Sequence, residues 1–160
     1  MKNKKKSNVV IAIDYDWSAQ KVAEAGYTLA LKLGAEITLL HIMSEPGHYP
    51  SSEHITVMGF AGFHAITPLV RVSVDGLKKA SYEFLEKTKD HLGDDSIKTL
   101  IVEGDCANSI ISTALDLRAD FIVLGSHGHR WLENIVMGSV VEEVLNKTTI
   151  PLYIVPTKKY

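Results

Sequence analysis

The sequence predicts a single α/β domain built on a parallel, five-stranded sheet with helices on both faces. Short, nearly continuous apolar runs alternate with longer segments in which apolar residues recur every three or four positions. The short runs are typical of strands buried on both faces, and strands that alternate with helices form parallel sheets with right-handed crossovers. No linker or low-complexity stretch divides the 160 residues, which are enough for one hydrophobic core.

Two strands and one helix are expected before residue 44. Asn8–Ile13 and Glu36–Ile42 are the short apolar runs that we expect to be strands. Between them, Ser18–Leu33 has the apolar spacing of a helix. Gly34 follows at the position of a helix C-cap, because glycine tolerates the left-handed conformation that ends many helices.

An irregular insertion interrupts the alternation over Ser44–Pro68, where prolines and glycines are frequent. We expect a loop packed on its own domain. Its aromatic residues leave two alternatives open, a lid over a ligand and a cover for a partner surface. Helical spacing resumes over Leu69–Leu92, and Gly93 is expected to end that helix.

The second half of the chain repeats the alternation. The expected strands and helices are Ser96–Glu103, Cys106–Leu117, Asp120–Leu124, Gly138–Asn146 and Pro151–Val155, in the order strand, helix, strand, helix, strand. A proline, Pro151, stands at the start of the last strand, which suits the edge of a sheet. An exposed edge can pair with a second chain, or residues 157–160 can cover it.

Charge and composition argue against several classes of partner. The formal net charge of -2 gives no electrostatic support for a nucleic-acid partner. Four lysines among the first six residues predict a flexible basic tail over residues 1–7. No apolar window is long enough for a membrane span, and no signal-peptide stretch follows the lysines. The lone cysteine, Cys106, cannot form an internal disulfide, which favours the reducing cytoplasm.

A spaced glycine motif directly follows the apolar run Asp120–Leu124. It reads Gly125-x2-Gly128-x9-Gly138-Ser139 and places a glycine-rich turn between a strand and a helix. Glycines let an anion approach the backbone closely, and free N–H groups at a helix start attract negative charge. The motif therefore indicates phosphate binding, although a turn and a helix N-cap alone would also suit these residues. The chain has neither a P-loop nor a dinucleotide-binding glycine motif after its first strand.

Three segments are expected to meet at the carboxyl ends of the strands, where ligands of such sheets bind. They are Ala12–Asp14, His41-Ile42 and the glycine-rich turn. Asp14 is suited to accept a hydrogen bond from a base amine or a ribose hydroxyl. It is equally suited to lie near a helix N-terminus without any ligand.

The residues indicate no catalytic or metal centre. His48, His54 and His64 lie in the insertion and lack the spacing of metal ligands. Cys106 begins a predicted helix, a position that can lower the pKa of a thiol. Because no second cysteine is available to resolve a reactive one, we expect Cys106 to be an ordinary small residue.

The chain resembles the universal stress protein family from Val9 to Val155. Its glycine motif is similar to that of the ATP-binding branch, whose pattern is G-x2-G-x9-G-[ST]. Weaker matches are found at Asp14, Leu40-His41-Ile42, Gly104-Asp105, Ala119-Asp120 and Ile150–Val155. The resemblance implies a Rossmann-like, three-layer fold of the adenine-nucleotide alpha-hydrolase type.

The resemblance also implies a binding pose for ATP. Ala12, Asp14 and Ile42 would border the adenine and ribose, while the glycine-rich turn and the N–H groups after Gly138 would hold the phosphates. Members of this branch often have Thr at the position of Val141, so one hydroxyl is lost there while backbone donation remains. The implied ATP-binding residues are Ala12, Ile13, Asp14, Ile42, Leu124, Gly125, Ser126, His127, Gly128, His129, Arg130, Gly138, Ser139, Val140 and Val141.

The function implied by the resemblance is an ATP-binding regulatory protein of the stress response. It would act as a homodimer joined through its terminal strands and would respond to ATP, with Mg or Mn as the candidate metal, by changing the surface seen by a protein partner. Two alternatives stay open, a slow ATPase or adenylyl-transferring enzyme and a dimer that no longer binds nucleotide. Because no residue is visibly placed to activate water, we expect at most weak ATP hydrolysis.

Overall fold

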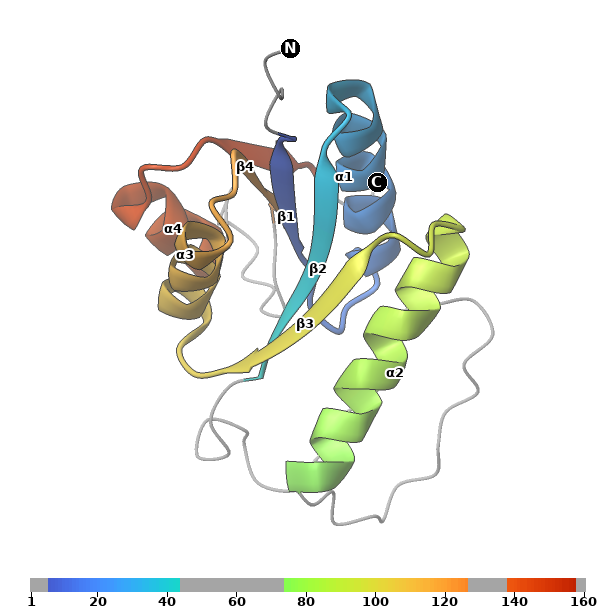
Figure 1. Ribbon diagram of the computed structural model, residues 1–160. Helices are drawn as coiled ribbons and strands as arrows, with labels where there is room; N and C mark the ends of the chain where they lie inside the picture. The colour runs from blue at the N-terminus through green and yellow to red at the C-terminus, as the bar shows by residue number, and fades with distance from the viewer. Residues whose placement is uncertain (1–5, 44–73, 127–137, 158–160) are drawn as a thin grey trace.

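The computed structural model describes residues 6–43, 74–126 and 138–157 (Figure 1). Within these ranges, strands and helices alternate along the chain. In chain order the elements are β1 Asn8–Ala12, α1 Ala19–Leu33, β2 Glu36–Met43, α2 Val74–Leu92, β3 Lys98–Glu103, α3 Cys106–Asp116, β4 Phe121–Gly125, α4 Ser139–Lys147 and β5 Leu152–Val155.

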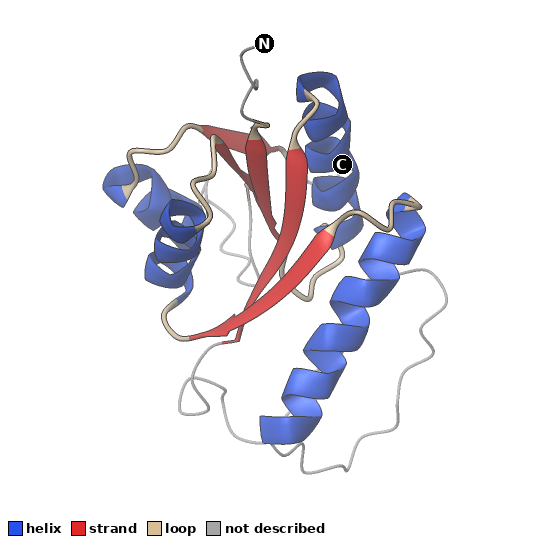
Figure 2. Ribbon diagram, viewed as in Figure 1, coloured by secondary structure: helices blue, strands red, loops and turns tan. Residues whose placement is uncertain are grey.

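The strands of the described ranges form one five-stranded sheet in the order β3-β2-β1-β4-β5, with every neighbouring pair parallel. Helices α1 and α2 cover one face, and α3 and α4 cover the other (Figures 1 and 2). The predicted α/β architecture is therefore confirmed. β1 lies at the centre with β2 on one side and β4 on the other, so the strand order reverses beside it.

Alternating side chains of β1 supply the two halves of the hydrophobic core. Val9 and Ile11 pack with residues of α1 and α2, whereas Val10 packs with residues of α3 and α4. Successive side chains of a strand point to opposite faces, so a strand covered on both faces needs apolar residues at every position. This explains why the sequence of β1 is a continuous apolar run.

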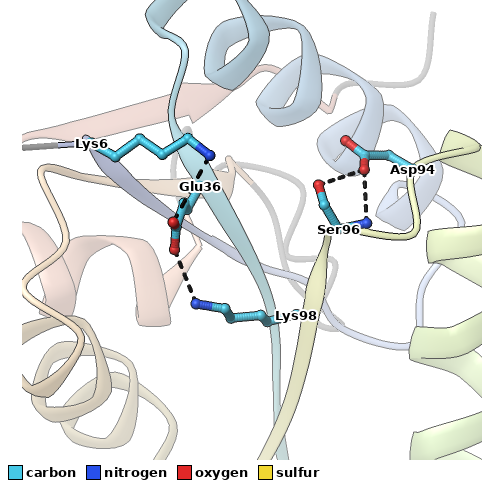
Figure 3. Close-up of polar contacts among 5 residues, drawn as sticks. All are labelled: Lys6, Glu36, Asp94, Ser96 and Lys98. Carbon is cyan, nitrogen blue, oxygen red and sulfur yellow. Dashed lines mark hydrogen bonds and ion pairs between the residues drawn. The ribbon is translucent and has the colours of Figure 1, made fainter.

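β3 begins at Lys98, later than the predicted start at Ser96, because a turn occupies the preceding residues. The Asp94 carboxylate accepts hydrogen bonds from the Ser96 N–H at 2.9 Å and from its hydroxyl at 2.6 Å (Figure 3). Such side-chain bonds favour a turn over an extended strand. Glu36 of β2 then pairs with Lys98 at 3.0 Å and with Lys6 at 3.9 Å, and these exposed ion pairs contribute little to stability.

Helix α1 ends at the glycine that was predicted to cap it. Gly34 has φ 60° at the C-cap of α1, a left-handed conformation that favours glycine. In the described ranges α2 begins at Val74, and the predicted start at Leu69, with the insertion over Ser44–Pro68, lies outside them. The other element bounds differ from the predictions by at most one residue, within the usual uncertainty of helix and strand ends.

β5 lies at one edge of the sheet, as predicted, and β3 lies at the other. Tyr153 on β5 keeps 42% of its surface exposed, so an aromatic side chain remains accessible at this edge. No helix in the part of the chain that the structure describes has the length and apolar character needed to cross a bilayer.

Candidate functional site

The strand register brings two predicted segments to the same end of the sheet. Ile11 of β1 pairs with Val123 of β4, so Asp14 and Ser126, each three residues further along, follow neighbouring strands at their carboxyl ends. Because the strand order reverses between β1 and β4, this is the place where open α/β sheets bind their ligands. Within the described residues, the end of β1 and the start of the glycine-rich turn, Gly125-Ser126, therefore lie at the same edge of the sheet.

On the β1 side, Asp14 presents the polar side chain. Ala12 is half-buried, Ile13 and Ile42 are buried, and Asp14 is exposed. The Ile13 N–H donates to the Leu40 carbonyl at 2.9 Å, which continues the pairing with β2 beyond the end of β1. The Asp14 carboxylate accepts from the Tyr15 N–H at 2.7 Å, and this bond fixes its direction relative to the backbone.

Beside Ile13 lies a buried histidine, His41, which belongs to one of the three segments predicted to meet here but whose side chain has no predicted role. His41 of β2 is 2% exposed, and its Nδ1 lies 3.0 Å from the Ile13 carbonyl oxygen. Burial lowers the pKa of His41, and the hydrogen bond to Ile13 and the charge of Asp14 oppose that shift only in part. A polar side chain within the apolar run of β2 is the sequence signal for a buried hydrogen bond at this residue.

On the β4 side, the two ends of the glycine motif are hydrogen-bonded to each other. The Gly138 N–H donates to the Ser126 carbonyl at 2.7 Å, so the start of α4 is held beside the end of β4. Within α4 the first helical bond runs from the Glu142 N–H to the Gly138 carbonyl at 3.0 Å. The N–H groups of the residues between them cannot be used by the helix itself, which makes this end of α4 suited to an anion.

The side chains at the start of α4 differ in burial. Ser139 is exposed, Val140 is half-buried, and Val141 is 3% exposed within the core beneath α3 and α4. Val141 can therefore offer a ligand its N–H but not its side chain. Leu124, which ends the buried part of β4, also packs in this core.

Gly125 has a packing reason as well as the predicted phosphate role. A Cβ atom at this position would lie 2.9 Å from Val22 Cγ2 and 3.2 Å from Thr157 Cγ2. Real Cβ atoms essentially never approach another atom as closely as 2.9 Å, so Val22 of α1 requires glycine here, and Thr157 after β5 adds a second tight contact. This contact could not be predicted from sequence, because the three residues lie far apart along the chain.

The Ser126 side chain bonds to the segment after β5. Its hydroxyl accepts from the Thr157 N–H at 3.0 Å and lies 3.2 Å from the Thr157 hydroxyl. Thr157 is 1% exposed, and the Ser126 N–H donates to the Val155 carbonyl at 2.9 Å. The turn after β4 is thus joined to the end of β5 by main-chain and side-chain bonds together.

The predicted residues His127, Gly128, His129 and Arg130 lie outside the described ranges, and so do His48, His54 and His64 of the insertion. Among the residues that the structure does describe, no group of three or more His, Cys, Asp or Glu side chains is arranged to hold a metal ion.

Cys106 is not activated by its place at the start of α3. Burial raises the pKa of its thiol to about 12, and the charges of Asp14, Asp105 and Glu143 act in the same direction. The N-cap of α3 is Asp105, whose carboxylate accepts from the Asn108 N–H at 2.9 Å. Burial, together with these carboxylates, thus acts against the lowering of a thiol pKa that a helix start can produce.

Comparisons with known proteins agree with this geometry. A model of the universal stress protein family matches residues 6–156. The universal stress protein YxiE of Bacillus subtilis is 27% identical over 151 residues, which are 93% of this chain and 98% of the relative.

Two similar solved structures are universal stress proteins with a nucleotide bound. One is a complex with cAMP, with a TM-score of 0.66 and 17% identity, covering 96% of this chain and 98% of that one. The other is from Archaeoglobus fulgidus, in complex with dAMP, with a TM-score of 0.59 and 17% identity, covering 92% of this chain and 96% of that one. At these identities the likeness establishes the fold.

Proposed function

The chain belongs to the universal stress protein family, and on that premise we propose that it binds an adenine nucleotide at the carboxyl ends of β1, β2 and β4. The observation that carries the proposal is the hydrogen bond from the Gly138 N–H to the Ser126 carbonyl. This bond holds the free N–H groups of α4 beside the glycine-rich turn, where the family resemblance puts the phosphates.

The preferred ligand is ATP, with Mg²⁺ or Mn²⁺ as its counter-ion. In this pose, Asp14 accepts from the ribose or the base, and Ile42 and Ala12 border the adenine. The N–H groups of Ser139, Val140 and Val141 donate to the phosphates, with the exposed Ser139 hydroxyl as a further donor. The nucleotides of the two structural neighbours, cAMP and dAMP, support an adenine ligand.

The proposed role is that of a nucleotide-dependent switch in a homodimer. Two observations support it, the exposed Tyr153 on the edge strand β5 and the bonds that join Ser126 to Thr157 just beyond that strand. A ligand that orders the turn after β4 would thereby act on the end of β5. A dimer formed through β5 could then present different surfaces to a protein partner with and without ATP.

Calorimetry with ATP and Mg²⁺ tests the proposal, and Gly138→Val is the site variant. Gly138 has φ -67° and ψ 151°, which other residues adopt without strain, so the variant should fold. The added side chain would crowd the N–H groups of α4, and we expect ATP binding to be abolished. Asn146→Val, an exposed position near the other end of α4, is the matched control and should bind as the natural chain does.

The outcomes separate the parts of the proposal. Unchanged ATP affinity in Gly138→Val would refute the phosphate position while leaving nucleotide binding in place. No heat from any adenine nucleotide, on protein whose circular dichroism is native, would refute nucleotide binding itself. Multiple-turnover release of phosphate would identify an ATPase rather than a binding protein.

A further inference from the structure

We propose that His41 is a positioning residue for Asp14. His41 contacts Ile13 and Tyr15, the residues before and after Asp14, and in this way orients the Asp14 carboxylate toward the ribose or base. The inference rests on the proposed nucleotide function, and it assigns to a buried side chain of β2 a role at a site that it does not touch.

The first contact is the hydrogen bond to Ile13, the residue before Asp14. His41 Nδ1 lies 3.0 Å from the Ile13 carbonyl oxygen. Because a carbonyl oxygen only accepts, Nδ1 must carry the proton. The Ile13 N–H donates to Leu40, so Ile13 is held at both its N–H and its carbonyl by adjacent residues of β2. The chain therefore leaves the sheet toward Asp14 from a fixed peptide plane.

The second contact is with Tyr15, the residue after Asp14. The rings of Tyr15 and His41 meet edge to face with their centroids 4.5 Å apart. Phe84 of α2 lies 4.5 Å from the Tyr15 ring and 6.0 Å from the His41 ring, so the three rings form one cluster. Because the Tyr15 N–H donates to the Asp14 carboxylate, holding Tyr15 also orients that carboxylate.

The burial of His41 makes this arrangement rigid. The side chain is 2% exposed, and burial lowers its pKa, so the ring is neutral near pH 7 with its proton on Nδ1. An apolar side chain of similar size would fill the space, but it would leave the Ile13 carbonyl without this donor. A role in packing alone does not require a nitrogen at the Nδ1 position.

Two substitutions separate the donor from the ring. In His41→Asn the side-chain amide nitrogen can reach the place of Nδ1, whereas in His41→Phe the ring stays and the donor is lost. We expect His41→Phe to weaken ATP binding about tenfold, which corresponds to losing the contribution of roughly one hydrogen bond, the one between His41 and Ile13. His41→Asn should retain more of the affinity. If His41→Phe does not fold, His41→Gln takes its place in the experiment. The glutamine amide nitrogen reaches the position of Nε2 and not that of Nδ1, so this variant also loses the donor to Ile13.

Two readouts distinguish positioning from general stability. Inorganic tripolyphosphate probes the phosphate end alone, and its affinity should be the same in the natural chain and in His41→Phe. Asp14→Ala should remove the effect, so that adding His41→Phe to it weakens ATP binding no further. Calorimetry on the natural chain, the two single variants and the double variant gives the comparison.

Each result decides the matter. ATP affinity that is unchanged in His41→Phe, an equal loss of ATP and tripolyphosphate binding, or additive losses in the double variant would each overturn the proposal while nucleotide binding stands. Failure of the natural chain to bind ATP would instead refute the proposed function, and the positioning role with it.

Discussion

The N–H of Gly138 donates to the carbonyl of Ser126 over 2.7 Å, and this bond joins two residues that belong to opposite ends of the glycine motif. Main-chain atoms alone make it, so it does not depend on side-chain identity. It also sets the direction of α4, because Gly138 is the N-cap of that helix. The proposed site therefore combines backbone groups whose positions the fold determines with side chains such as that of Asp14, whose position depends on its neighbours.

Gly125→Ala should destabilise the protein by about 1–3 kcal/mol, the usual cost of overpacking. The added methyl would lie 2.9 Å from Val22 Cγ2, a branched and buried side chain that cannot move aside easily. Urea denaturation measures the change. Val22→Ala makes room for the methyl, so the double variant should lose less than the sum of the two single losses.

Ser126→Ala should cost about 1–3 kcal/mol, because it removes the acceptor of the buried Thr157 N–H. Thr157→Val is the matched control, since it keeps the N–H and the methyl near Gly125 and loses only the hydroxyl. Thermal melts of the two variants should show the larger decrease in Ser126→Ala. Equal decreases would mean that the contact between the two hydroxyls, and not the N–H bond, holds this segment.

The stability of the protein should decrease on acidification because of His41. Its folded-state pKa lies below the ordinary value of 6.5, so the unfolded chain binds this proton first as the pH falls. The contribution is therefore complete above about pH 7 and is lost below about pH 6.5, with a slope of at most about 1.4 kcal/mol per pH unit. Denaturation midpoints from pH 5 to 8 should depend on pH less steeply in His41→Phe. Parallel curves for the two proteins would contradict the assignment.

Cys106 should react slowly with iodoacetamide while the protein is folded. A pKa of about 12 leaves a thiolate fraction near neutral pH that is about a thousandfold below that of an ordinary cysteine. Mass spectrometry should find rapid labelling in denaturant, which serves as the control. Equally fast labelling of the native protein would show that the thiol is not shielded.

Tyr153→Lys should weaken the proposed dimer, because it puts a flexible charge at the edge that would pair. Sizing at micromolar concentration should give a dimer for the natural chain and a monomer for the variant. An apparent mass near 17.6 kDa for the natural chain would count against the dimer.

The order of strands and helices could be predicted from sequence because helices cover both faces of the sheet. A strand buried on both faces is apolar on both sides, so it is recognisable as a short apolar run. The edge position of β5 followed from that order and is found in the structure, as is the placement of Asp14 and Ser126 after neighbouring strands. The contacts that refine the site could not be predicted. Gly125 with Val22, and His41 with Ile13, are close approaches between distant parts of the chain, and no local pattern encodes them.

The placement of β1 has a consequence for biosynthesis. β1 precedes the other four strands of this sheet along the chain and yet takes the middle of the sheet, and Val9 pairs both with Ile37 and with Phe121. Until β4 has been synthesised, one side of β1 in the nascent chain has no strand to pair with. Such long-range pairing slows folding and leaves the unfinished sheet prone to aggregation. We therefore expect the sheet to stay incomplete during synthesis, with β1, β2 and β3 formed, until β4 has emerged.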